Sequence, residues 1–143
     1  MYRGSVARRT SDGTTGAAAW ELIAPATRAI SVREILVILA AATASTFGLG
    51  RPAAKGITPT APVLNLDEQG SIDPLTTSTA IAWGTGPTAP AQFYRRTSFP
   101  AVISSFTLWT FPNGLIVPAG LTLVLWNLAA NGVVDIHAVV QEG

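Results

Sequence analysis

Cysteine is absent from this chain of 143 residues. A chain without thiols forms no disulfides and offers no thiolate ligands to a metal, so two common ways of stabilising a small fold are excluded. The same absence removes the usual marker of the redox compartment. The chain must therefore depend on its own apolar core, and its length is sufficient to bury one within a single domain.

Charge is the second property that the sequence has little of. Charged residues make up 12% of the chain, about half the usual share in a soluble domain, whereas apolar residues make up 48%. A net charge of +1 gives almost no repulsion between copies. This composition favours a subunit whose surface is covered by partners, and it does not favour a free enzyme.

Long apolar runs are also lacking. The longest, Ile35 to Ala42, is far shorter than the roughly 20 residues that span a bilayer. Residues 1–15 contain arginines and glycines but no apolar core of a signal peptide. We therefore expect neither membrane insertion nor a secretory signal.

What the sequence does contain is the alternation typical of β-strands, clearest near the C-terminus. In residues 121–127, Leu121, Leu123 and Leu125 occupy alternate positions. In residues 133–141 apolar residues again occupy alternate positions. Asn131-Gly132 adopts positive φ at low cost, so the chain can turn back between the two runs. These runs predict two neighbouring antiparallel strands at the centre of an all-β domain.

Turn-forming residues divide the rest of the chain into further short β-prone runs. Residues 30–42 are ambiguous, because a helix could begin at Ser31 with Glu34 three residues later, but the β-branched residues there favour a strand. Pro112-Asn113-Gly114 is predicted to turn the chain into its closing strands. The predicted strands are 17–24, 30–42, 43–51, 76–83, 91–99, 105–111, 121–127 and 133–141. About eight strands predict an antiparallel β-sandwich of the jelly-roll type, forming one domain over residues 17–143.

Two segments remain outside this pattern. Residues 1–16 are rich in Arg, Ser, Thr and Gly, and they predict an extended N-terminal arm that is either ordered on a neighbouring subunit or a solvated terminus. Residues 53–73 contain prolines that exclude a central strand, and long loops of this kind are usually functional or interfacial. From these two segments we predict the partner-contact residues Tyr2, Arg3, Arg8, Arg9, Pro59, Pro62 and Leu64.

The single histidine offers the one candidate for catalysis. His137 and Asp135 alternate onto the same face of a predicted strand, and such a pair could hold an imidazole for acid–base chemistry. However, no Ser or Thr of the chain stands in a nucleophile-elbow context. We interpret the pair as polar residues facing solvent or an interface, and we predict that the protein is not an enzyme and has no catalytic residue.

Ligands for metals and cofactors are equally scarce. Asp67, Glu68 and Asp73 surround Gly70 and could hold a hard cation, but their spacing does not match the calcium-loop pattern, so a solvated turn is the preferred interpretation. One histidine without cysteine does not suit a transition-metal site. We therefore predict no metal and no cofactor.

Two other motifs suggest anion binding only superficially. Residues 48–50 and 84–86 resemble fragments of phosphate-binding loops, but neither opens a helix or precedes Lys-Ser or Lys-Thr, so both are predicted to be turns. Arg95-Arg96 follows two aromatic residues, a combination that can suit single-stranded nucleic acid. Strand alternation divides these four residues between opposite faces, so we predict no nucleic-acid binding.

Several stretches together resemble a known class of proteins. They are GLGRP (48–52), RRTSFPAV (95–102), TLWTFPNG (107–114) and PAGLTLVLWN (118–127). In order and pattern, residues 17–141 resemble the small structural proteins encoded among the head and tail genes of tailed bacteriophages. Jelly-roll members of that class often act as decoration or cement proteins, which sit as trimers on the capsid lattice and clamp neighbouring capsid subunits.

The resemblance implies a structural virion protein on the capsid surface. Its expected partners are further copies of itself, in a homo-oligomer of three, and the major capsid protein. A tail, fibre or baseplate component is the alternative within the same class. A carbohydrate-binding β-sandwich module is the alternative from another class, and aromatic residues grouped on one exposed sheet face would favour it.

Overall fold

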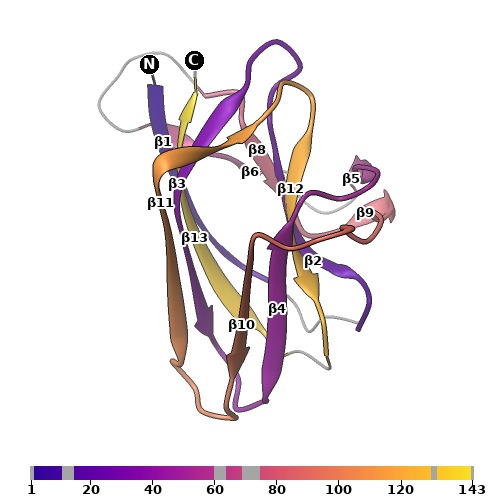
Figure 1. Cartoon of the computed structure of the whole chain (residues 1–143), viewed down its shortest axis with the longest axis vertical. Coiled ribbons are helices and arrows are strands. Elements are labelled where there is room, and N and C mark those ends of the chain that lie inside the picture. Colours follow the sequence, from indigo (N-terminus) through magenta and orange to yellow (C-terminus); the bar gives the residue numbers. More distant parts are fainter. Residues whose placement is uncertain (1, 11–14, 60–63, 69–74, 130–131, 143) are drawn as a thin grey trace.

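The computed structural model describes residues 2–10, 15–59, 64–68, 75–129 and 132–142, and all regular structure in these ranges is β-strand. The strands form an antiparallel sandwich (Figure 1), which confirms the predicted fold class. None of these ranges contains a helix long and apolar enough to cross a membrane. The strands are β1 (Tyr2–Arg9), β2 (Ala18–Ile23), β3 (Ile30–Leu39), β4 (Ser45–Gly50), β5 (Ile57–Pro59), β6 (Leu64–Asn65), β7 (Asp67–Glu68), β8 (Ser78–Ala80), β9 (Trp83–Thr85), β10 (Arg95–Phe99), β11 (Phe106–Val117), β12 (Thr122–Asn127) and β13 (Val134–Glu142).

Two sheets make the sandwich. Within the described residues, the five-stranded sheet has the order β11-β3-β13-β1-β7, and the six-stranded sheet has the order β10-β4-β12-β2-β8-β6. Strands β5 and β9 pair separately as a small ribbon outside the six-stranded sheet (Figure 1). The segment at 30–39 is a strand in the first sheet, so the strand interpretation of this ambiguous stretch is confirmed.

The pairing of the long strands is nested. Strand β1 pairs with β13, β2 with β12, β3 with β11 and β4 with β10, so the first strand meets the last and each later strand meets its counterpart from the other end. An antiparallel ribbon folded in this way is a jelly roll. The two sheets hold 11 strands rather than the predicted eight, because β1 at the start of the chain and the short strands β6 and β7 join the predicted ones.

The core lies between the sheets and follows from a period of two. Along β13 buried and half-buried residues alternate without interruption, which places Ile136 and Val140 in the interior. In β3 the alternation is interrupted, because the register with β13 skips Arg33 and leaves both Arg33 and Glu34 outside the core. Trp20 of β2 enters the same interior from the opposite sheet, fully buried. Burying one large apolar side chain contributes about 1.5–3 kcal/mol, and such contributions hold the sheets together.

The N-terminal segment differs from its prediction as an arm. Residues 2–9 are β1, which pairs along its whole length with β13 and also contacts β7, so the backbone hydrogen bonds that an isolated arm lacks are formed within the sheet. Arg8 points between the sheets, where Nη1 donates to Thr79 O at 3.0 Å and to Thr79 Oγ1 at 3.2 Å. Burial lowers the pKa of Arg8. The predicted partner contact at Arg8 is therefore wrong, because its guanidinium links the two sheets internally.

The glycines at 48–50 and 84–86 were predicted to form turns, but Gly48 and Gly50 lie within β4, and Gly84 lies within β9. Close approach by distant residues explains the two glycines of β4. A Cβ at Gly48 would lie 2.5 Å from Cδ1 of Phe93, and one at Gly50 would lie 2.8 Å from Gln92 O. Glycine is needed because another chain segment lies directly on this strand.

Strand β11 extends beyond its predicted end at residue 111. It continues through Pro112-Asn113-Gly114 to Val117, and its register with β3 shifts between Thr110 and Leu115. The predicted turn is therefore a bulge within one long strand, with Gly114 at a φ of 78°. This extension leaves β11 as a 12-residue strand at the margin of the five-stranded sheet.

Candidate interaction surface

The two sheets differ in what lies on their outer faces. Outside the six-stranded sheet lie residues 51–59 and 83–93, here called the cover segments (Figure 1). Glu21 of β2 anchors them: its Oε2 accepts from Gly56 N at 3.1 Å, and its Oε1 accepts from Trp83 Nε1 at 2.9 Å. Beneath the cover segments, Val124 is fully buried and Trp126 is 6% exposed. This outer face is therefore a second, smaller apolar core.

No described segment lies on the outer face of the five-stranded sheet near β11. Cross-strand pairs place Phe106 beside Ile38 and Leu108 beside Leu36, with their side chains on the outer face. Phe106 is 68% exposed and Leu108 is 49% exposed. Four adjacent large apolar side chains thus meet solvent on a rigid sheet.

The loop between β10 and β11 extends this apolar surface around the end of the sandwich. Val102 and Ile103 are each 58% exposed. The loop conformation is held from both sides, because Ser104 N donates to Leu39 O and Leu39 N donates to Ser105 O, each at 2.8 Å. Ser104 has a φ of 70°, a conformation that costs a non-glycine residue about 1 kcal/mol or more. The loop is therefore built to hold its apolar side chains outward.

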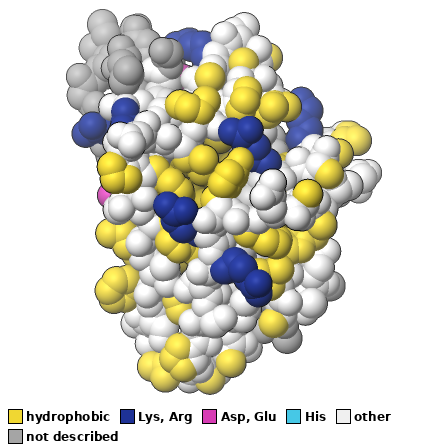
Figure 2. Space-filling model, in the orientation of Figure 1, with side chains coloured by type: hydrophobic (Ala, Val, Ile, Leu, Met, Phe, Trp, Pro, Cys, Tyr) yellow, Lys and Arg dark blue, Asp and Glu magenta, His cyan; other side chains and the backbone are white. Residues whose placement is uncertain are grey.

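These six residues form one surface, which we call the apolar end: Leu36, Ile38, Val102, Ile103, Phe106 and Leu108. Figure 2 shows apolar side chains and no lysine or arginine at the lower end of the visible face, where Figure 1 places the β10–β11 loop. Polar residues border it on the next strand, because Asp135 pairs with Ile38 and His137 with Leu36. An apolar patch with a polar rim is typical of a protein interaction site.

Basic residues occupy the side of the sandwich above the apolar end (Figure 2). The exposed members are Arg51, Lys55, Arg95 and Arg96. Two of them lie over aromatic rings, Arg95 at 4.9 Å from the Phe111 centroid and Arg51 at 5.9 Å from that of Tyr94. Such stacking fixes a guanidinium in place and leaves its charge toward solvent. Positive charge is therefore kept apart from the apolar end.

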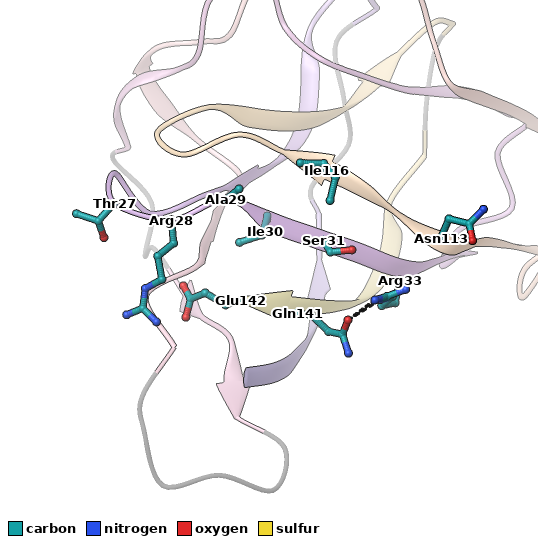
Figure 3. Close-up of a pocket in the computed structure, with 10 residues that line it drawn as sticks. All are labelled: Thr27, Arg28, Ala29, Ile30, Ser31, Arg33, Asn113, Ile116, Gln141 and Glu142. Atoms are coloured by element: carbon teal, nitrogen blue, oxygen red, sulfur yellow. Dashed lines mark hydrogen bonds between the residues drawn. The ribbon is translucent and has the colours of Figure 1, made fainter. Parts of the chain in front are cut away.

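A cavity of about 470 Å³ opens at the other end of the molecule, between the start of β3, the middle of β11 and the end of β13 (Figure 3). Arg33 crosses it, with Nε donating to Gln141 Oε1 at 2.7 Å and Nη1 donating to Pro112 O at 3.1 Å. Glu142 is buried and accepts hydrogen bonds from Thr76 and Thr77. These hydrogen bonds join the strand ends around the cavity.

Comparisons with protein-family models, with curated proteins and with solved structures found no match. The function is therefore inferred from the fold and from the surface of the chain itself.

Those predicted partner-contact residues whose side chains the structure describes are not brought together by the fold. Arg3 is exposed on β1, and Pro59 is half-buried in β5 of the ribbon. Tyr2 and Arg9 lie in β1 and Leu64 lies in β6, but the positions of their side chains are outside the described part of the structure, as is the whole of Pro62. None of the residues placed in this way belongs to the apolar end.

The candidate polar sites are placed as follows. Asp135 and His137 are half-buried on the outer face of the five-stranded sheet. Asp67 and Glu68 form β7, although their side chains are outside the described residues, and Asp73 is outside them altogether. Within the described ranges, no three His, Asp or Glu side chains gather as metal ligands would.

Aromatic residues do not group on an exposed sheet face within the described ranges. Trp20, Trp109 and Trp126 are buried, and the indole of Trp83 donates its N–H to Glu21. Of the exposed aromatic residues, Tyr94 precedes β10 of the six-stranded sheet, whereas Phe106 lies in β11 of the five-stranded sheet. The arrangement that would favour a carbohydrate-binding module is thus not found among these residues.

Sequence reasoning missed the apolar end, although one signal could have revealed it. Ala101-Val102-Ile103 follows Pro100 and precedes two serines, so three apolar residues stand in a loop, where polar residues are expected. A short connection between strands in different sheets cannot bury such residues itself. The apolar loop tip could therefore have been identified from the sequence as a candidate interaction surface.

Proposed function

We propose that the protein is a structural virion protein, most specifically a decoration protein that oligomerises on a bacteriophage capsid and stabilises its lattice. Two features support this proposal. The jelly roll is an architecture that recurs in viral capsid domains. The pattern of the chain also resembles small structural proteins of tailed bacteriophages, a resemblance that covers most of its length.

The observation that carries the proposal is the exposed apolar end. The loop of Val102 and Ile103 is held by hydrogen bonds in a conformation that keeps these side chains in water. Covering one such side chain contributes about 1.5–3 kcal/mol, from which the entropy of association must be subtracted. The apolar end can therefore form a stabilising contact only when another protein covers this surface.

The mechanism of such a protein is thermodynamic. Each copy covers its apolar end on a capsid subunit or on another copy, so disassembly of the lattice must first return that surface to water. A contact repeated over the whole shell adds up even if each one is modest. The protein therefore needs no catalytic group to act.

Mass spectrometry of purified particles tests the location directly. We expect this chain in the particle at a copy number comparable with that of the major capsid protein. A much smaller number would instead indicate a tail, fibre or baseplate component, and absence from the particle would overturn the proposal.

A binding assay tests the surface. Particles that lack the protein should sediment together with added wild-type chain. A variant with Val102→Ser and Ile103→Ser should lose most of this binding, whereas Ile57→Ser should retain it. Ile57 is a matched control because it is 61% exposed but lies on the ribbon, away from the apolar end. Equal binding by both variants would exclude the apolar end as the docking surface.

A further inference from the structure

The margin of the five-stranded sheet has an open backbone edge. Strand β11 ends the sheet, and its 12 residues include no charged side chain. Leu39 N donates to Ser105 O at the start of the ladder with β3, so the carbonyl of Ser105 faces β3. Because hydrogen-bonding residues alternate along antiparallel strands, Thr107 turns its N–H and C=O toward β3. Phe106, Leu108 and Thr110 then turn theirs outward.

Arginine side chains close only the upper part of this edge. Pro112 O accepts from Arg33 Nη1, and Ile116 O accepts from Arg51 Nη2. Further down, no described residue provides a backbone partner to Phe106, Leu108 or Thr110 on the outward side. We call residues 106–110 the open edge. Proteins usually protect such edges with charges, bulges or a covering segment, and within the described ranges none of these lies along the outward side of the open edge.

The neighbouring margin of the other sheet is protected. Strand β10 ends the six-stranded sheet and carries Arg95 and Arg96, both exposed. Charged side chains of this kind oppose pairing with another strand. The two neighbouring margins therefore differ, because β10 carries charged side chains and β11 carries none.

We propose that the open edge pairs with the open edge of a second copy of this chain, antiparallel and about a two-fold axis at Leu108. This inference rests on the proposed function and names the contact between copies. Leu108 then lies opposite Leu108 of the second copy, and Phe106 lies opposite Thr110 of the second copy. Three hydrogen-bonded pairs give about six backbone hydrogen bonds, since each such pair exchanges two. The two five-stranded sheets become one continuous sheet.

Electrostatics permit this pairing. The placed charges near the axis at Leu108 include Glu34, which pairs with Thr110, and Arg95, which lies over Phe111, three residues along β11 from the axis. The two copies of Glu34 are then roughly 20 Å apart, four residues along the strands and three strand spacings across them. The two copies of Arg95 are then separated by roughly 20 Å along the strands, at about 3.4 Å per residue. That distance exceeds the Debye length of about 8–10 Å at physiological salt, so their repulsion is largely screened.

The pairing also enlarges the docking surface. Paired residues of antiparallel strands place their side chains on the same face, so Phe106 and Leu108 join those of the second copy in a single row on the outer face. The two apolar ends become one continuous strip. The edge contact satisfies the backbone and leaves this strip available for a capsid subunit. The edge contact gives a dimer, whereas the phage resemblance implies a trimer.

Cross-linking tests the register. The chain has no cysteine of its own, so Leu108→Cys introduces a single thiol. Across the axis the two Cα atoms of a hydrogen-bonded pair lie about 5.5 Å apart, within the disulfide range of about 4.4–6.8 Å. Mild oxidation should give a disulfide-linked dimer on a non-reducing gel. Thr110→Cys is the matched control, because its two copies lie four residues apart, about 14 Å, and should not cross-link. Failure of Leu108→Cys, or equal yield from both variants, overturns the pairing.

Light scattering on a sizing column tests the contact without a cross-link. The wild-type chain should be a dimer, and a monomer or a trimer overturns the proposal. Leu108→Pro removes an N–H that faces the open edge but leaves the ladder with β3 complete, so the variant should be a folded monomer by circular dichroism. Leu36→Lys, on the same outer face but on an inner strand, should remain a dimer. A dimeric Leu108→Pro variant counts against the pairing.

The particle-binding assay separates this proposal from the proposed function. A chain that forms the cross-linked dimer but does not bind particles refutes the decoration function and leaves the pairing intact. A chain that binds particles but fails the cross-link refutes the pairing and leaves the decoration function intact.

Discussion

The two outer faces of this sandwich are built from similar strands but differ in how far their apolar side chains are covered. On the six-stranded sheet Trp126 lies beneath the cover segments and is 6% exposed, whereas on the five-stranded sheet Phe106 is 68% exposed. Among the residues that the structure describes, segments cover the first face, and none covers the second near β11. The difference teaches that apolar side chains on an outer sheet face can be covered from within the chain, as on the six-stranded sheet, whereas the proposed function assigns the cover of the other face to a partner.

The covered face depends on a few specific contacts. Glu21 holds both cover segments through Gly56 and Trp83, and it accepts a third hydrogen bond from Thr122 Oγ1 at 2.8 Å. On the five-stranded sheet the counterpart is Glu34, a half-buried glutamate of β3 on the outer face. One glutamate organises a buried contact and the other faces outward, so the pair provides a direct comparison of the two faces.

The largest effect is expected at Glu21. Glu21→Ala leaves one buried and two half-buried donors without their acceptor. Each unsatisfied group costs about 1–3 kcal/mol, so the free energy of unfolding should fall by about 3 kcal/mol. Glu34→Ala should change it by less than about 0.5 kcal/mol, as is usual for surface substitutions. Urea unfolding of both variants measures the difference. Equal losses would show that the cover segments do not depend on Glu21.

A smaller loss is expected at Gly50. A Cβ there would lie 2.8 Å from Gln92 O and 2.9 Å from Pro90 Cβ, so Gly50→Ala must displace the backbone of a cover segment. Such overpacking costs about 1–3 kcal/mol. Gly86→Ala is the control, because the nearest atom to its Cβ is 4.0 Å away, and its unfolding free energy should stay within about 0.5 kcal/mol. A neutral Gly50→Ala would mean that the cover segment is not firmly seated.

Local pattern was sufficient to predict most of the long strands but not the contacts between distant segments. The alternation in residues 30–39 and 134–142 is a property of neighbouring residues, so it could be found without the fold. The role of Gly50 depends on Gln92, far along the chain, so a turn was predicted instead. The strand at residues 2–9 was missed for the same reason, because its partner β13 is at the other terminus.

The candidate surface shows the same division. Val102 and Ile103 are visible in the sequence as apolar loop residues, but the hydrogen bonds between Ser104, Ser105 and Leu39 that hold them outward are not. Likewise, the lack of charge in β11 can be read from the sequence. That β11 lies at a sheet margin follows from the nested pairing of all the long strands, which no local pattern contains.

The same comparison can be made within β1, where Arg8 faces the interior and Arg3 faces solvent. Arg8→Ala removes hydrogen bonds to Thr79 that link the two sheets, and a charged hydrogen bond of this kind contributes about 1.5–3 kcal/mol, so we expect a loss near the lower limit. Arg3 is exposed, so Arg3→Ala should be neutral. Thermal unfolding of the two variants measures the difference. If Arg8→Ala were also neutral, the segment would behave as the arm that the sequence predicted.

The smallest effect on the isolated chain is expected on the uncovered face. Phe106→Ser removes a large apolar side chain that is already mostly in water, so the free energy of unfolding should change by less than about 0.5 kcal/mol. The same change lowers the exposed apolar area, so the variant should precipitate at a higher ammonium sulfate concentration than the wild type, because excluded salts strengthen the burial of apolar surface. Thr110→Ser, on the same strand and face, should precipitate as the wild type does. A marked loss of stability in Phe106→Ser would show that this face is already covered within the chain, and the contrast between the two sheets would then fail.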